Sequence, residues 1–182
     1  MEIPVKGTYT DFYEITMGQA YFLSGDHEKP ASFDYFFRKN PFKGGYVIFA
    51  GLRPLLEVLQ NFTFSESDLQ KLKEYKLDSR YLDYLRDFSF RGDIYAVEEG
   101  EPVFPGEPVM RVEATVIEAQ MIESLLLNFI NYPSLIATKA HRMRMVAGEA
   151  VLSDFGLRRA QGTGANLAAR SAVIGGFNST SN

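Results

Sequence analysis

The C-terminal segment of the chain constrains the fold most, because it alternates between short apolar runs and a loop with a helix. Ala150–Ser153 predicts a short strand that ends at Asp154, and after a glycine-containing loop a helix is expected over about Asn166–Val173. A second apolar step, Val173-Ile174, leads into Gly175-Gly176-Phe177 and predicts the next strand. Strand, loop, helix and strand in this order indicate the opening of a β/α barrel.

The barrel cannot be complete, because a closed eight-stranded barrel takes roughly 200 residues or more by itself. We therefore expect an α/β chain in two parts. Residues 1–114 should form an N-terminal mixed α/β (α+β) domain. Residues 115–182 should contain linking helices and the first units of an irregular β/α barrel. The chain is then expected to be a piece of a longer protein, with a fold smaller than a barrel as the alternative.

Capping signals and alternating patterns predict the elements that precede the barrel. Thr10-Asp11 with Glu14 should open a helix that runs to about Leu23, and two short helices are expected after Ser65 and after Asp78. The predicted strands are Asp34–Arg38, Gly45–Phe49 and a pair, Asp93–Val97 and Pro108–Val112, joined by a tight loop.

A further capping box begins the linking region. Thr115 with Glu118 should open a helix of about 16 residues, which Pro133 is expected to break. Pro133 would then occupy the first turn of a second helix that ends at Gly148.

Composition narrows the class of protein. The 182 residues are 46% hydrophobic, enough for a real core, and the absence of cysteine excludes disulfides, thiolate metal sites and cysteine nucleophiles. The net charge of -4 argues weakly against nucleic acid. No leader peptide or membrane-spanning run is visible, so a cytoplasmic location without membrane contact is expected.

The charge is unevenly distributed. Residues 1–120 carry 13 Lys and Arg against 20 Asp and Glu, whereas residues 121–182 carry 6 against 3. A small anionic ligand would therefore meet a favourable local field near the C-terminal end of the chain.

Four segments, in matching order and spacing, give the chain a resemblance to nicotinate phosphoribosyltransferases that extends over essentially its whole length. They are Thr10-Asp11-Phe12-Tyr13-Glu14-Ile15-Thr16-Met17, Phe37-Arg38-Lys39-Asn40-Pro41, Asp154-Phe155-Gly156-Leu157-Arg158-Arg159-Ala160 and Gly176-Phe177-Asn178-Ser179-Thr180-Ser181-Asn182.

The resemblance implies the type II phosphoribosyltransferase architecture and the ATP-coupled transfer of phosphoribose from phosphoribosyl pyrophosphate to nicotinate, with Mg²⁺, in NAD biosynthesis. It also implies a homodimer whose active sites are shared between subunits. The family's catalytic histidine lies beyond Asn182, and neither His27 nor His141 matches it. By the resemblance, this chain alone should not be a competent enzyme.

The reaction needs positioned cations more than covalent help from the protein, because pyrophosphate leaves and the substrates are anionic. Arg158 and Arg159 follow a predicted strand on the loop where barrel enzymes place their sites, and arginine holds carboxylates and phosphates by two-point contact. The alternative is an ordinary pair of surface arginines. Gly162 and Gly164, before the predicted helix, are candidate phosphate-binding positions.

Other candidates depend on the resemblance. It implies that Tyr13 stacks on nicotinate in the neighbouring subunit's site and that Ser179, Thr180 and Ser181 bind substrate after the second strand. Tyr13 could instead be a core residue, and the Ser/Thr run an ordinary turn. Lys139 and Arg142 share one helix face and are further phosphate-binding candidates, with a solvated face as the alternative.

Rival functions remain open at this point. A nicotinamide or quinolinate phosphoribosyltransferase is the nearest alternative. The Gly92–Val112 segment also suggests a biotinyl- or lipoyl-like binding module, although it contains no lysine for attachment. Asp154-Phe155-Gly156 does not indicate a kinase, because the other kinase motifs are missing, and Asp154 is expected to orient the arginines or a metal-bound water. No residue spacing predicts a metal site formed by protein ligands alone.

Overall fold

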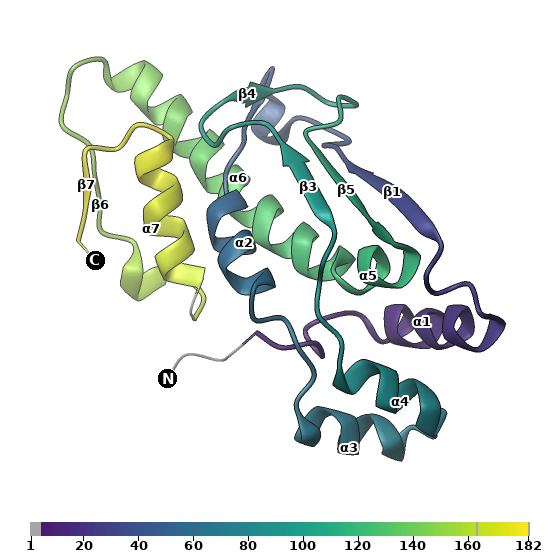
Figure 1. Cartoon of the computed structure of the whole chain (residues 1–182). Helices are drawn as coiled ribbons and strands as arrows, with labels where there is room; N and C mark the ends of the chain where they lie inside the picture. Colours follow the sequence, from purple (N-terminus) through teal and green to yellow (C-terminus); the bar gives the residue numbers. More distant parts are fainter. Residues whose placement is uncertain (1–4, 163, 182) are drawn as a thin grey trace.

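The computed structural model describes residues 5–162 and 164–181, and within them it has a mixed α/β fold (Figure 1). The helices are α1 Phe12–Ser24, α2 Leu52–Leu59, α3 Glu66–Glu74, α4 Ser79–Arg86, α5 Val116–Met121, α6 Glu123–Ala147 and α7 Gly164–Ile174, with 3-10 turns η1 Pro41–Lys43 and η2 Leu157–Arg159. The strands are β1 Pro30–Tyr35, β2 Val47–Ile48, β3 Asp93–Ala96, β4 Pro102–Val103, β5 Met110–Thr115, β6 Ser153–Asp154 and β7 Ser179–Thr180.

An antiparallel sheet of order β1-β5-β3 forms the upper layer, and α5 and α6 pass beneath it (Figure 1). The predicted pairing of the strands near Asp93 and Val112 is confirmed, with Ile94 opposite Val112. β5 also pairs with β1, which spans Pro30–Tyr35. β1 both begins and ends before the predicted strand Asp34–Arg38 does. The pairing of six residues with β5 fixes the position of β1, and no local pattern carries that information.

The connection between β3 and β5 is not the tight loop that was predicted. It contains β4, which pairs antiparallel with β2, so that Val47 lies opposite Val103. The pairing continues beyond the strands, since Phe49 N donates to Glu101 O at 3.0 Å and Gly100 N donates to Phe49 O at 2.8 Å. This segment is therefore built into the core rather than displayed as a free hairpin.

The prediction that Pro133 ends a helix is wrong. The break falls at Ile122 instead, and α6 continues through Pro133. Proline has no N–H to give to the Phe129 carbonyl one turn earlier, and Gly51 lies so close to that oxygen that a Cβ on Gly51 would be 1.9 Å from it. The missing side chain of Gly51 thus leaves space for the carbonyl that the proline leaves without its usual donor.

Two hydroxyls in the next turns of α6 reinforce this junction. Ser134 Oγ accepts from Ala50 N at 3.0 Å, and Thr138 Oγ1 accepts from Ile48 N at 2.8 Å. The buried end of β2 is therefore hydrogen-bonded to side chains of α6, and this fastens the N-terminal layer to the long helix.

The short helix α2 has no counterpart among the predicted elements. Its N-cap residue is Gly51, which has a φ of 104° and no side chain to cap the helix. Glu99, from a distant loop, instead satisfies the N–H of the N-cap residue itself, because its Oε1 accepts from Gly51 N at 2.6 Å. Glu99 also forms a two-point contact with Arg170 of α7, at 2.7 and 2.5 Å. A single carboxylate thus links α2 to α7.

The capping boxes predicted at Ser65 and Thr115 are confirmed, as is the Asp78 cap of α4. The helix predicted after Asp11 is confirmed too, but its expected capping box does not form. Glu14 is buried in the interior instead, where its Oε1 accepts from Ser124 Oγ at 2.9 Å.

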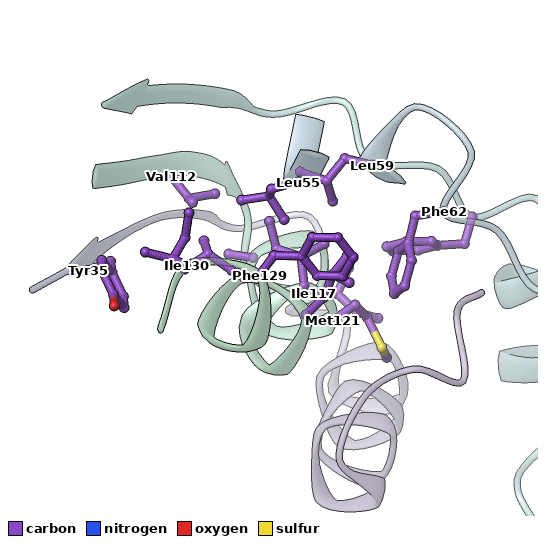
Figure 2. Close-up of a cluster of buried hydrophobic side chains, with 14 of the residues drawn as sticks. Tyr35, Leu55, Leu59, Phe62, Val112, Ile117, Met121, Phe129 and Ile130 are labelled. Carbon is purple, nitrogen blue, oxygen red and sulfur yellow. The ribbon is translucent and has the colours of Figure 1, made fainter. Parts of the chain in front are cut away.

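The main core fills the space between the sheet, α5, the first half of α6 and the helices that surround them. Figure 2 shows part of it, where side chains from the sheet, α2, α5 and α6 converge. The labelled members are Tyr35, Leu55, Leu59, Phe62, Val112, Ile117, Met121, Phe129 and Ile130.

The C-terminal part contains the predicted parallel β/α unit. β6 and β7 pair in parallel, and α7 connects them and packs on α6 (Figure 1). The second strand was predicted six residues too early, because Val173-Ile174 is the end of α7 and Ser179–Thr180 is β7. Ile174 packs in a small cluster with Ile48 and Ala137, so its apolar character reflects helix packing.

Candidate functional site

The loop that leaves the C-terminal end of β6 presents the two arginines singled out in the sequence. Asp154 Oδ1 accepts from Gly156 N at 2.9 Å and turns the chain directly after the strand. A Cβ at position 156 would lie 2.8 Å from the same oxygen, so this turn favours glycine. Arg158 and Arg159 follow in η2 with exposed side chains that a ligand can reach.

A cavity of about 310 Å³ lies beside this loop, between α6 and α7. Its polar lining comes from Tyr132, Asp154, Arg159 and Gln161. Small alanine side chains of α7 line another part of it: Ala165, Ala168 and Ala172. The Arg159 guanidinium can pair with an anionic group of a ligand, and the alanine side chains leave room beside it. Of the two arginines, Arg159 lines this cavity and Arg158 does not.

The Ser/Thr run lies at the same strand end, although its first two residues form β7 rather than follow it. Ser181 N donates to Asp154 O at 2.8 Å, and Ser179 Oγ lies 2.7 Å from Ser153 Oγ. Parallel pairing therefore brings Ser179, Thr180 and Ser181 next to the loop that carries the arginines.

The two glycine candidates flank the start of α7. Gly162 has a φ of 52°, in the left-handed region that favours glycine. Gly164 is already the first residue of the helix, and its N–H donates to Gln161 O at 3.1 Å. The Gly164 amide is thus engaged within the chain.

Lys139 and Arg142 contact a different part of the molecule. Lys139 Nζ lies 5.2 Å and the Arg142 guanidinium carbon 5.9 Å from the centre of the Phe42 ring. Arg142 also donates to Phe42 O at 2.7 Å. Both cations are exposed, and together they cover the η1 turn.

Tyr13 is not a core residue, since 48% of it is exposed on α1. Its hydroxyl is anchored and donates to Glu123 Oε1 at 3.5 Å. Partial burial and the Glu123 carboxylate raise the pKa of Tyr13 to about 12, so the hydroxyl stays protonated. Figure 1 shows α1 and the β6–β7 pair on opposite sides of the molecule, so Tyr13 does not meet Arg158 or Arg159 of its own chain.

Two aromatic residues of this region were not predicted as site residues from the sequence. Phe155 lies within the arginine motif, and 61% of it is exposed, which is unusual for a phenylalanine. Tyr132 lines the cavity from α6. The position of Phe155 between Asp154 and Arg158 was a usable signal, whereas only the packing of α6 against the loop identifies Tyr132.

Two negative findings apply to the part of the chain that the structure describes. No group of three or more acidic or histidine side chains there could hold a metal ion. Within residues 5–162 and 164–181, no helix is both long enough and apolar enough to cross a bilayer.

Comparison with known proteins is consistent across sequence and structure. The protein-family model of the nicotinate phosphoribosyltransferase N-terminal domain matches residues 8–131 of this chain. The nicotinate phosphoribosyltransferase of Bacillus subtilis is 50% identical over 182 residues, an alignment that covers 96% of this chain and 36% of that protein. The Caenorhabditis elegans enzyme is 44% identical, with 98% of this chain and 33% of that protein covered.

The crystal structure of human nicotinic acid phosphoribosyltransferase superimposes with a TM-score of 0.88 at 37% identity, covering 95% of this chain and 36% of the human one. A nicotinate-nucleotide pyrophosphorylase from Pyrococcus furiosus has a TM-score of 0.74 at 22% identity, a likeness that concerns the fold alone. The chain thus spans about a third of the length of these nicotinate phosphoribosyltransferases. With a family model over more than half of its residues and close relatives along nearly all of it, the chain belongs to the nicotinate phosphoribosyltransferase family.

Proposed function

We propose that the complete protein containing this chain joins nicotinate to phosphoribosyl pyrophosphate, forming nicotinate mononucleotide and pyrophosphate for NAD biosynthesis. The observation that carries the proposal is the exposed Arg158-Arg159 pair at the C-terminal end of β6, beside a cavity with a wall of small residues. Arginine pairs charge with the carboxylate of nicotinate and with phosphates by two-point contact. Family membership supports the same reaction.

The pyridine ring needs an aromatic or apolar surface while its carboxylate meets a cation. The exposed ring of Phe155 lies on the same loop as Arg158 and can provide one such surface. Tyr13 supplies a second surface in this proposal, from the neighbouring subunit. Since Tyr13 and the arginines lie on opposite sides of one chain, their joint use requires two copies, and we therefore propose a homodimer with shared sites.

Mg²⁺ and ATP belong to the proposal as well. Mg²⁺ is commonly held by one or two carboxylates together with substrate phosphates and water, and Asp154 is the carboxylate that lines the cavity. When bound, Mg²⁺ would neutralise charge on the leaving pyrophosphate. ATP coupling would depend on the family's histidine, which the resemblance locates beyond Asn182.

Two further expectations stay predictions. The division into an N-terminal domain over residues 1–114 and a barrel portion from residue 115 can be tested by limited proteolysis. The cytoplasmic location can be tested by cell fractionation.

Calorimetric titration of the complete protein with three pyridines tests the choice of substrate. We expect nicotinate to bind, and nicotinamide and quinolinate to bind much more weakly, because one carboxylate matches the cavity's single arginine. Tight binding of quinolinate without binding of nicotinate would contradict the proposal. No specific observation favours the biotinyl- or lipoyl-like alternative, since the Gly92–Val112 segment is paired with β2.

A further inference from the structure

The first turn of α1 is attached to the start of α6 through a carboxyl group that no solvent reaches. Glu14 is fully buried, and its Oε1 accepts from Ser124 Oγ at 2.9 Å. The same Ser124 hydroxyl accepts from Asp11 N at 3.3 Å. Ser124 therefore holds both the residue before α1 and a side chain in its first turn.

Tyr13 belongs to that turn, and its hydroxyl lies close to two carboxyl groups. It donates to Glu123 Oε1 at 3.5 Å, and Glu14 acts on it as well. Gln120 Nε2 donates to the other oxygen of Glu123 at 3.1 Å and fixes that carboxylate. The Tyr13 hydroxyl is thus anchored while much of the residue stays exposed, an arrangement that presents an aromatic ring in one orientation.

The surroundings of Glu14 favour its neutral form. Among the described residues, its Oε2 has no partner with normal hydrogen-bond geometry. The titratable groups that act on it are Asp11 from the N-cap of α1, Tyr13 from α1 and Glu123 from α6, and none of them is a cation. Burial, opposed by the Ser124 hydrogen bond and reinforced by Glu123 and Asp11, raises the pKa of Glu14 to about 7.

From this geometry we propose that Glu14 is a positioning residue, whose buried carboxyl, together with Ser124 and Glu123, holds the Tyr13 ring in the orientation that stacks on the pyridine substrate. The inference rests on the proposed function. Ionised Glu14 would repel the Glu123 carboxylate that anchors Tyr13, because Glu14 is fully buried and water screens its charge little. Rising pH should therefore loosen Tyr13 and weaken pyridine binding.

The test is steady-state kinetics of the complete protein from pH 6 to 8.5, with KM measured separately for nicotinate and for phosphoribosyl pyrophosphate. In the wild type, the nicotinate KM should rise roughly three- to tenfold with pH, the range expected for losing one aromatic contact. Glu14→Gln should lose this pH dependence. Ser124→Ala should raise the nicotinate KM by a similar factor at pH 6, with little change in kcat or in the KM for phosphoribosyl pyrophosphate.

Ser24→Ala, at the exposed far end of α1, is the matched control and should behave as the wild type. A wild-type pH profile in Glu14→Gln, or an unchanged nicotinate KM in Ser124→Ala, would overturn the inference. Parallel losses in melting temperature and in both KM values would also overturn it, since they indicate a structural role. A wild type that does not use nicotinate would overturn the proposed function and this inference together.

Discussion

Glu99→Gln tests whether one carboxylate joins α2 to α7. Glu99 accepts from Gly51 N at 2.6 Å and from both terminal nitrogens of Arg170, and only 15% of its side chain is exposed. Burial alone would raise the pKa of Glu99, but the hydrogen bonds from Arg170 and Gly51 outweigh it and hold the pKa below its usual value. This contribution to stability is therefore present at neutral pH and is lost as pH falls below the ordinary range of glutamate.

The size of the loss follows from the bonds removed. Hydrogen bonds to charged groups are each worth about 1.5–3 kcal/mol, and the glutamine amide can replace only part of the two-point contact, so we expect a loss of about 2 kcal/mol. If α2 opens locally, that loss speeds amide exchange at the start of α2 about 30-fold. Hydrogen–deuterium exchange of the complete protein measures this directly.

The matched control is Asp34→Asn. Asp34 forms the same two-point contact with Arg111, at 2.7 and 3.0 Å, but on the exposed face of the sheet. Exposed pairs contribute little, so exchange in β1 should hardly change. Equal acceleration in the two variants, or none in α2 of Glu99→Gln, would refute the argument from burial.

Four further substitutions have defined outcomes in thermal melting of the complete protein. Gly51→Ala should lower the free energy of unfolding by at least about 3 kcal/mol, because it adds strain at positive φ and a clash with the Phe129 carbonyl. Gly106→Ala is its control: position 106 has a positive φ but open space around it, so this variant should lose only about 1 kcal/mol. Thr115→Ala removes the capping box of α5 and should cost about 1 kcal/mol. Glu14→Gln should stabilise the protein more at pH 8 than at pH 5. The pKa of Glu14 is raised to about 7 in the folded protein, so the wild type loses stability as pH rises from the ordinary glutamate range to 7. The same gain in stability at both pH values would contradict this.

Features determined by neighbouring residues could be predicted from the sequence. The boxes at Ser65 and Thr115 lie within four residues of chain, and the structure contains both. The β/α rhythm was also visible, because β6, α7 and β7 follow one another closely and the unit needs no distant partner to be recognised.

Features that depend on distant contacts could not be predicted. Pro133 stays inside α6, and the carbonyl that it leaves without a donor lies against Gly51, which is far away in the sequence. β7 was misplaced because its residues are polar and pair through Ser153 and Ser179, whereas the apolar Ile174 belongs to a helix packed on α6.

The candidate site likewise has features that neighbouring residues determine and features that depend on distant contacts. Arg158 and Arg159 could be predicted from the sequence, because they come after a predicted strand within a motif. The cavity beside them could not be predicted, because it depends on α6, which contributes Tyr132. The role proposed for Tyr13 would depend on a second subunit, and one folded chain does not contain that contact.

The kinetics of Arg158→Ala and of Arg159→Ala in the complete protein test the central claim most directly, since that claim assigns the binding of anionic substrates to the loop after β6. We predict that the KM for nicotinate or for phosphoribosyl pyrophosphate rises at least about tenfold, in line with the loss of a charge-assisted two-point contact. Unchanged values of kcat and of both KM constants in both variants would remove the two arginines from the site and contradict the account.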